Sequence, residues 1–284
     1  MQGIDLHTHS NISDGALTPE DLVRKAVESG IHTLALTDHD SMDGLKRAEI
    51  VACENQIKLI SGVEISSQWS RPSTKKSYGV HIVGLNMQDR GYLDEVLAEQ
   101  KQIRAQRAVE ICHKLEKILK QDFYPDVLAK VDGIADRVTR SHIAQVLLEK
   151  RVVNRLQQAF DRFLKTGKPA FVAFEWLSLE KTIQAIHSAK GLAVLAHPTK
   201  YDLSATNIRY LMELFTKYGG DAVELPPSSE TASSRQMIDR LIVEHGLKVS
   251  IGSDFHGEHM PWLHLGRVPM LKEGQEGVWE SFIS

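Results

Sequence analysis

Short apolar runs alternate with amphipathic stretches at both ends of the chain. Near the start, apolar runs at 4–6, 31–37, 58–65 and 78–85 predict strands, and the patterns at 19–29 and 42–54 predict helices. Thr18-Pro19 followed by two acidic residues is typical of a helix N-terminus. Near the end, helices are predicted over 179–189, 206–218 and 231–245, with strands over 192–196, 222–225 and 247–251. Strands that alternate with helices usually pair in parallel, so the pattern predicts an α/β fold whose roughly seven units form a closed or nearly closed barrel.

The middle of the chain follows a different pattern. From residue 92 to 169 the periodicity is helical, with one long helix expected over 93–121 and others from 141 and over 156–164. We therefore predict a barrel formed by residues 1–91 and 170–284, with a helical insert domain at 92–169 that covers the active site.

Composition and charge narrow the class of protein. The 284 residues are 42% hydrophobic and 25% charged, as in an ordinary globular protein, and the formal net charge is −3. This balance argues against specific duplex DNA binding, which usually needs a strongly basic face, but it leaves room for a small basic pocket. No secretory signal or long apolar span is found, and Cys53 and Cys112 read as free buried thiols, so we expect a cytoplasmic protein with no membrane contact.

Histidine changes the picture most, because the chain has thirteen and many follow predicted strands. In an extended chain, residues two apart share a side, so His7 and His9 can reach one ion. The same spacing recurs at Asp254 and His256 after the last strand. The other candidates at strand ends or in the following loops are Asp14, His39, Glu64, His81 and His197. The carboxyl ends of barrel strands are where active sites are built, so we predict one shared metal site.

The number and type of these residues indicate the metals. Nine candidates exceed the roughly four ligands of one zinc ion, so two or three ions are expected. Imidazole and carboxylate without thiolate favour Zn, Mn or Fe. Taken singly, His81 would be an ordinary core histidine and Asp14 a loop-stabilising acid; their gathering at strand ends supports the shared site. We interpret six other histidines as structural: His32, His113, His187, His245, His259 and His264.

These residues stand in motifs that resemble the PHP (polymerase and histidinol phosphatase) family. The matching segments are HTHSNISDG at 7–15, LTDHD at 36–40, GVEIS at 62–66, His81, AHP at 196–198 and GSDFH at 252–256. The resemblance implies a distorted (βα)7 TIM-like barrel with a trinuclear site. It implies one ion at His7, His9, Glu64 and Asp254, a second at Glu64, His81 and His197, and a third at Asp14, His39 and His256. Asp14 stands where some relatives carry histidine, which puts the third site in doubt or favours a harder ion such as Mn²⁺.

Within the family, the insert resembles the bacterial branch of ribonuclease AM and 3′,5′-nucleoside bisphosphate phosphatase. The segments that carry this likeness are TRSHIA at 139–144 and GKPAFV at 167–172. The resemblance implies hydrolysis of the 3′-phosphate of nucleoside 3′,5′-bisphosphates and 5′-3′ trimming of 5′-phosphorylated single-stranded RNA. A metal-bridging hydroxide would attack phosphorus, with Mn²⁺ as the expected ion and Zn²⁺, Fe²⁺ or Mg²⁺ as alternatives.

A phosphate substrate also needs cationic side chains. Arg140, Arg104, Arg107 and Lys168 are our candidates for substrate binding, because guanidinium groups bind phosphate in a bidentate manner. Our hypothesis is that the ions cut the 3′-ester while the arginines bind the 5′-phosphate. For RNA, a base could stack on Phe171.

Three alternatives remain open at this stage. A histidinol-phosphate-type phosphatase would use the same family site on another ester. An amidohydrolase also has two histidines after its first strand, but it usually has a bridging modified lysine where Glu64 stands. A non-catalytic, metal-stabilised module would lack several of the ligands, and none is missing here.

Overall fold

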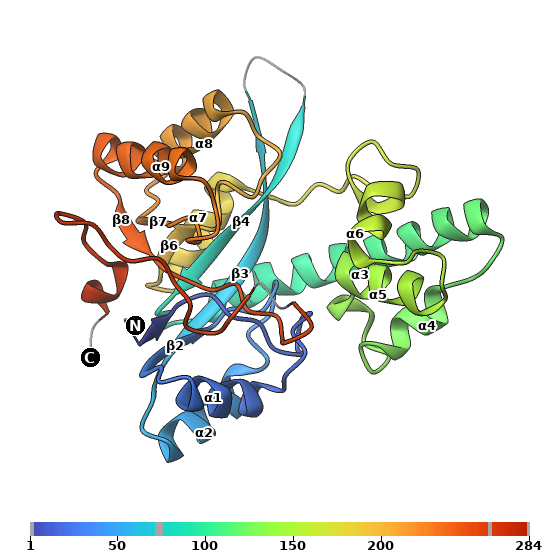
Figure 1. Cartoon of the computed structure of the whole chain (residues 1–284), viewed down its shortest axis with the longest axis horizontal. Coiled ribbons are helices and arrows are strands. Elements are labelled where there is room, and N and C mark those ends of the chain that lie inside the picture. Colours follow the sequence, from blue (N-terminus) through green and yellow to red (C-terminus); the bar gives the residue numbers. More distant parts are fainter. Residues whose placement is uncertain (1–2, 72–75, 261–262, 283–284) are drawn as a thin grey trace. The chain divides into compact units, whose positions relative to one another are not determined.

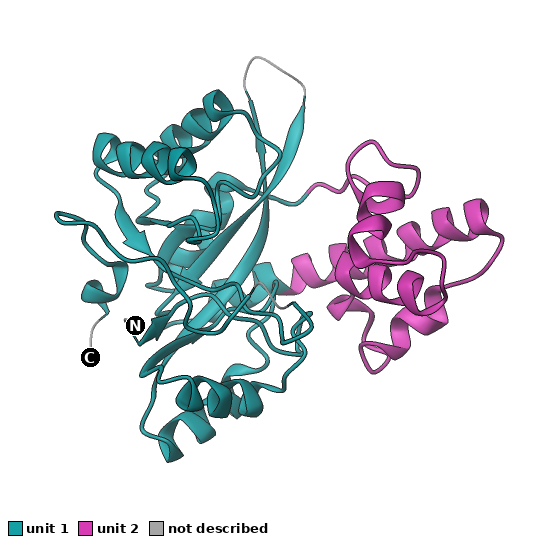
Figure 2. Cartoon of the chain, viewed as in Figure 1, with its two compact units in different colours: residues 1–97, 176–284 teal, residues 98–175 magenta. Residues whose placement is uncertain are grey.

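The computed structural model describes residues 3–71, 76–260 and 263–282 (Figure 1). The chain divides into two compact units, residues 1–97 with 176–284 and residues 98–175 (Figure 2). The predicted insert began at residue 92, before this division. The reason is that helix α3 (Gly91–Leu119) is continuous, while its first residues Leu93, Val96 and Leu97 are buried in the core of the first unit.

A curled sheet forms the centre of the first unit. Its strands follow the order β1 (Ile4–Asp5), β2 (Thr33–Leu36), β3 (Lys58–Ser70), β4 (Ser77–Leu85), β6 (Leu192–Leu195), β7 (Ala222–Glu224) and β8 (Lys248–Ser250), and β5 (Leu177–Ser178) pairs with β3. The all-parallel prediction was wrong at β4, which runs antiparallel to both β3 and β6. Too few residues separate Ser70 from Ser77 for the crossover that a parallel strand would need.

The two ends of this sheet meet through the segments that follow β1 and β8. Backbone hydrogen bonds join these segments. Leu6 N–H donates to the Ile251 carbonyl at 3.0 Å, Asp254 N–H donates to the His7 carbonyl at 2.9 Å, and His9 N–H donates to the Phe255 carbonyl at 3.0 Å. These bonds close the ring at the level of the candidate ligands. The expectation of a distorted TIM-like barrel is confirmed.

Five helices of the first unit cover the outer face of the sheet (Figure 1): α1 (Pro19–Glu28), α2 (Leu45–Glu54), α7 (Leu179–Ser188), α8 (Ala205–Lys217) and α9 (Ala232–His245). Local chemistry fixes their ends. Thr18 accepts from Asp21 N–H as the N-cap of α1, as the sequence predicted. Gly246 ends α9 in a left-handed conformation with φ of 64°, which glycine adopts without steric cost. Their apolar faces pack on the sheet in one core that includes Leu22, Ile186 and Phe215.

The inside of the barrel has its own apolar core. Ile60, Val83 and Ala222, from β3, β4 and β7, are members, and the C-terminal residues Val278 and Phe282 pack against it. Side chains two apart on a strand point to the same face. Therefore Glu64, four residues after Ile60, and His81, two before Val83, continue the inward face of their strands. Because β4 is antiparallel, its first half lies at the edge where the parallel strands end.

The second unit is helical and has a separate core. It contains most of α3, then α4 (Tyr124–Ala129), α5 (Arg140–Glu149), α6 (Leu156–Ala159) and a π-helical turn over Phe160–Leu164. Leu115, Phe123 and Leu147 are fully buried in its centre. Thr139 caps α5 and accepts from the backbone of Ser141 and His142. Within the described ranges, no helix of either unit has the length and apolarity to cross a bilayer.

Candidate metal centre

Glu64 occupies the middle of the candidate site. Its carboxylate is fully buried, and five imidazoles surround it. The nitrogen-to-oxygen distances are 2.8 Å from His39, 2.8 Å from His81, 3.0 Å from His197, 3.4 Å from His7 and 3.4 Å from His9. Because these histidines come from four segments far apart in the sequence, β3 brings the whole set together.

Two further carboxylates complete the cluster. Asp254 Oδ1 lies 3.6 Å from His7 Nε2 and 3.3 Å from His9 Nε2. Asp14 Oδ1 lies 3.2 Å from His256 Nε2 and 3.6 Å from His39 Nε2. The nine residues that the sequence placed at strand ends therefore gather in one place.

The spacing of these atoms fits bound ions. Ligand atoms about 2.1 Å from one tetrahedral ion lie about 3.4 Å from one another, and several of the distances above are 3.3–3.6 Å. His7 Nε2, His9 Nε2 and Asp14 Oδ1 are buried and make no hydrogen bond of ordinary geometry within the described residues. Buried polar atoms without partners are costly, so these atoms point to cations as their missing partners.

The atoms fall into four overlapping groups. These are His9, Asp14, His39 and His256; His7, His9 and Asp254; His7, Glu64 and His197; and His39, Glu64 and His81. Glu64, His7, His9 and His39 each belong to two groups, so neighbouring ions would share them. The grouping differs from the implied one in that His39 reaches Glu64 as well as Asp14. The role of all nine residues as ligands stays a prediction.

Burial and neighbouring charge act in opposite directions on these groups. Burial raises the pKa of Glu64, but His81, His39 and His7 oppose it and hold that pKa well below the ordinary value. Burial, helped by His256, lowers the pKa of His9 to about 3. Ionised carboxylates and neutral imidazoles are the forms that bind metals. The shifts at Glu64 and His9 favour these forms. At His7 and His256 burial lowers the pKa, but nearby carboxylates, chiefly Glu224 at His7 and Asp14 at His256, together outweigh it and raise the pKa, to about 9 at His256, so these two imidazoles would release protons on binding ions.

Backbone geometry at the site is unusual at two ligands. His197 has φ of 28° and Asp254 has φ of 55°, positive values that side chains other than glycine rarely adopt. Gly252, two residues before Asp254, packs so closely on His7 that an added Cβ would lie 2.2 Å from the His7 Cβ. A strained backbone held by its surroundings is common where side chains must be aimed.

Sequence reasoning missed three residues that contact the cluster. Glu224 Oε2 lies 2.6 Å from His7 Nδ1, Lys200 Nζ donates to Asp254 Oδ2 at 2.8 Å, and the Tyr201 hydroxyl bonds the backbone at His81. Glu224 could have been found, because it ends a predicted strand on the same face as Ala222. Lys200 and Tyr201 follow His197 in a turn that carries no comparable signal.

The loop after β1 is held by Asp38, which the sequence placed beside His39. Its carboxylate accepts from Ser10 N–H at 2.8 Å, from Ser10 Oγ at 2.6 Å and from Ser13 Oγ at 2.7 Å. Asp40 acts in the same way on β3, accepting from Ser66 N–H at 2.7 Å. These carboxylates fix the segments that carry His9, Asp14 and Glu64.

The predicted substrate-binding residues lie in the second unit. Arg104 is buried in α3, and Arg140 begins α5. Burial, and after it the positive charge of Arg104, lowers the pKa of Arg140. Arg107 is half-buried on α3, whereas Lys168 is exposed and lies near Asp161. Arg104 and Arg140 therefore form a basic pair within the insert, in which the charge of one acts on the other.

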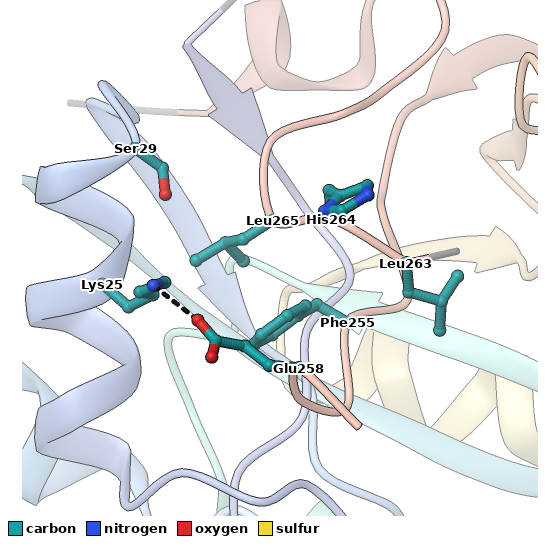
Figure 3. A pocket seen from close by; sticks show the side chains of 7 residues that line it. All are labelled: Lys25, Ser29, Phe255, Glu258, Leu263, His264 and Leu265. Carbon is teal, nitrogen blue, oxygen red and sulfur yellow. Dashed lines mark hydrogen bonds and ion pairs between the residues drawn. The ribbon is translucent and has the colours of Figure 1, made fainter. Parts of the chain in front are cut away.

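A separate cavity of about 430 Å³ is lined in part by Phe255, which stands between the candidate ligands Asp254 and His256 in the sequence (Figure 3). Its lining includes the ion pair between Lys25 and Glu258, at 2.7 Å, and His264. The ion pair is already neutral and no cluster of metal ligands is present in the lining. This cavity is not the reacting site.

The fold and the clustered imidazoles and carboxylates define a barrel hydrolase with a candidate polynuclear metal centre. The PHP-domain family model matches residues 5–176, and the chain belongs to this family. It is 42% identical over 98% of both chains to a 5′-3′ exoribonuclease of Haemophilus influenzae. It is 35% identical to a 3′,5′-nucleoside bisphosphate phosphatase of Chromobacterium violaceum, over 90% of this chain and 88% of that one.

The fold also matches a solved structure from Chromobacterium violaceum described as an amidohydrolase with bound sulfate and no metal. The TM-score is 0.90, with 32% identity over 99% of this chain and 95% of that one. The predictions of the PHP family, of the fold and of a hydrolase acting on phosphate esters are confirmed. Metal dependence is supported by the family and by the grouped ligands.

Proposed function

We propose that this protein is a manganese-dependent phosphoesterase that removes the 3′-phosphate of nucleoside 3′,5′-bisphosphates and trims 5′-phosphorylated RNA from its 5′ end. The observation that carries the proposal is the cluster around Glu64, in which five imidazoles converge on one buried carboxylate. The relatives named as an exoribonuclease and as a bisphosphate phosphatase, both similar over nearly the whole chain, support the substrate class.

The chain's own residues would divide the work as follows. Glu64, Asp14, Asp254 and the six histidines would hold two or three ions, which supply Lewis acidity and an activated water when bound. Glu224 orients His7 by accepting from its Nδ1–H, so that Nε2 faces the cluster. Lys200, next to Asp254, is placed to pair with an oxygen of the substrate phosphate.

The donor set, which mixes carboxylates with imidazoles and has no thiolate, fits Zn²⁺, Mn²⁺ or Fe²⁺, and among these we propose Mn²⁺. Asp14 in particular adds a hard oxygen to the group of His9, His39 and His256. Metal content after growth in Mn²⁺, Zn²⁺ and Fe²⁺, measured together with activity after chelation and reloading, tests this choice. Full activity with Zn²⁺ and none with Mn²⁺ would overturn it.

The basic pair of the insert supports the two-phosphate substrate. The charge of Arg104 disfavours the protonated form of Arg140, and the negative charge of a bound phosphate would favour it. We therefore propose that Arg104 and Arg140 bind the 5′-phosphate. Arg140→Ala should raise KM for a 3′,5′-bisphosphate at least about tenfold and leave KM for a 3′-monophosphate nearly unchanged. The matched control is Arg155→Ala, which removes an exposed arginine of the same unit.

One substrate panel separates the candidate functions. Phosphate release is measured from adenosine 3′,5′-bisphosphate, adenosine 3′-monophosphate, histidinol phosphate and a 5′-phosphorylated oligoribonucleotide, with Mn²⁺ added after chelation. We expect the bisphosphate and the oligonucleotide to react with the highest kcat/KM. Equal kcat/KM for the bisphosphate and the 3′-monophosphate would remove the case for a 5′-phosphate contact.

A cyclic amide belongs in the same panel, because the solved relative is described as an amidohydrolase. The site offers Glu64 as its central bridging group and a late Asp254-Phe255-His256 segment, which favour phosphate esters. Hydrolysis of the amide without phosphate release would instead identify an amidohydrolase. Preference for histidinol phosphate would identify the histidinol-phosphatase alternative.

A further inference from the structure

Strand β4 and the segment that follows β6 bear two of the candidate ligands, His81 and His197, at the point where the two strands stop pairing. The strands are antiparallel, with Ile82 opposite Leu195, so His81 stands opposite Ala196, the residue before His197. Opposed residues in such a ladder can exchange two backbone hydrogen bonds. One of these is made directly, from Ala196 N–H to the His81 carbonyl at 3.1 Å.

The second connection runs through the side chain of Tyr201. His81 N–H donates to the Tyr201 hydroxyl at 2.8 Å, and that hydroxyl donates to the Ala196 carbonyl at 2.8 Å. The same oxygen lies 3.3 Å from the His81 carbonyl. One hydroxyl group is therefore inserted between two backbone groups that would otherwise bond each other.

The bridged backbone groups belong to His81 and to the residue before His197, and the imidazoles of these two histidines meet at Glu64. His81 Nδ1 lies 2.8 Å and His197 Nε2 lies 3.0 Å from the same oxygen, Glu64 Oε1. The Tyr201 ring stands edge-on to the His197 ring, with centroids 5.4 Å apart. His197 also has the unusual φ of 28°, and Tyr201 closes the turn that contains it by bonding back to Ala196.

We propose that Tyr201 is a positioning residue that holds His81 and His197 at the spacing required for the ions that share Glu64. The proposal rests on the proposed metal-dependent function. Without the hydroxyl, His81 N–H and the Ala196 carbonyl can bond directly, and the backbone at these two residues reorients about the hydrogen bond that already joins them. Both imidazoles then leave their present places beside Glu64. The group of His9, Asp14, His39 and His256 has no part in this bridge.

The test compares Tyr201→Phe with Tyr218→Phe in the full chain. Tyr218 packs against the core of the same unit, so its substitution removes a tyrosine hydroxyl away from the ligands. Mn²⁺ stoichiometry and affinity are measured by calorimetric titration and by metal analysis after chelation and reloading. Expected for Tyr201→Phe is the loss of one ion or about 10- to 100-fold weaker binding at one class of site. The remaining site and the Tyr218→Phe variant should bind as the wild type does.

Several outcomes would overturn the proposal. Wild-type Mn²⁺ affinity in Tyr201→Phe, even with a lower Tm, would make the hydroxyl a merely structural feature. Equal weakening at every site would indicate general damage. If Tyr201→Phe does not fold, Tyr201→4-aminophenylalanine keeps a polar hydrogen-bonding group on the ring. Near wild-type Mn²⁺ binding in this variant supports the bridge, and binding at the level of a variant with two ligands removed refutes it.

The metal readout also separates this proposal from the proposed function. A wild-type protein that binds Mn²⁺ but releases no phosphate from the panel would end the proposed substrate assignment. The effect of Tyr201→Phe on ion binding would still be measurable in that protein. A wild-type protein that binds no divalent ion would overturn both.

Discussion

The contact between Glu224 and His7 gives the most direct test of how the site is organised. Both side chains are buried, and the carboxylate oxygen lies 2.6 Å from Nδ1. A carboxylate at this position makes Nδ1 the donor and leaves Nε2 as the ligand atom, 3.4 Å from Glu64 and 3.6 Å from Asp254. Removing such a partner typically weakens metal binding about 10- to 100-fold, equivalent to about 1.4–2.7 kcal/mol.

Two substitutions should span this range. Glu224→Gln keeps a neutral acceptor for Nδ1–H, so we expect about tenfold weaker Mn²⁺ binding; Glu224→Ala removes the acceptor, and about 100-fold is expected. The assay is the Mn²⁺ dependence of phosphate release, supported by calorimetric titration. Asp221→Asn is the matched control, because it neutralises the carboxylate of another histidine–carboxylate pair, His187 with Asp221 at 2.9 Å, away from the ligands. The reasoning fails if all three variants bind Mn²⁺ equally well.

Three other outcomes follow from stability and thiol chemistry. Adding 1 mM Mn²⁺ to the chelated protein should raise Tm by about 5–10 °C, because an ion with Kd near 10 µM adds about 2.7 kcal/mol to the free energy of unfolding. An unchanged Tm, measured by calorimetry, would contradict a structured ion site. Burial raises the pKa of the Cys112 thiol to about 12, whereas Cys53 is exposed. Ellman's reagent should therefore titrate one thiol in the native protein and both thiols in urea. Two thiols that react equally fast in the native protein would be inconsistent with this structure. Leu85→Ala should lower the free energy of unfolding, measured in urea, by about 2–5 kcal/mol. The control Val243→Ala, at a residue that is 80% exposed, should lower it by less than about 0.5 kcal/mol. Equal losses would mean that Leu85 is not packed inside the barrel.

Most helix ends could be predicted because their signals are local. Thr18, Ser178, Ser204 and Thr231 each accept from a backbone N–H in the first turn of the following helix. The length of β3 could not be predicted, since Ser66–Ser70 reads as a polar loop. Those residues are extended because β4 pairs along all of them and Trp69 packs on Tyr78, with ring centroids 5.6 Å apart.

The direction of β4 could not be predicted either. A buried apolar run has the same pattern whichever way the strand runs, so YGVHIVGL was assigned to a parallel strand by analogy with its neighbours. The reversal matters for function, because it places His81, in the middle of β4, opposite Ser66 on β3 and within 2.8 Å of Glu64.

The sequence predicted the candidate ligands that directly follow strands. It did not predict the residues whose role depends on their neighbours in three dimensions. Glu224 shares the inward face of β7 with the core residue Ala222, so the same alternation that placed Glu64 on β3 applies to it. It was overlooked because it stands alone, with no histidine two residues away. Tyr201 has no such pattern, since its hydroxyl acts on the backbone of β4 and of the segment after β6. Side chains that position ligands through the backbone can therefore be recognised only after the pairing of the strands is known.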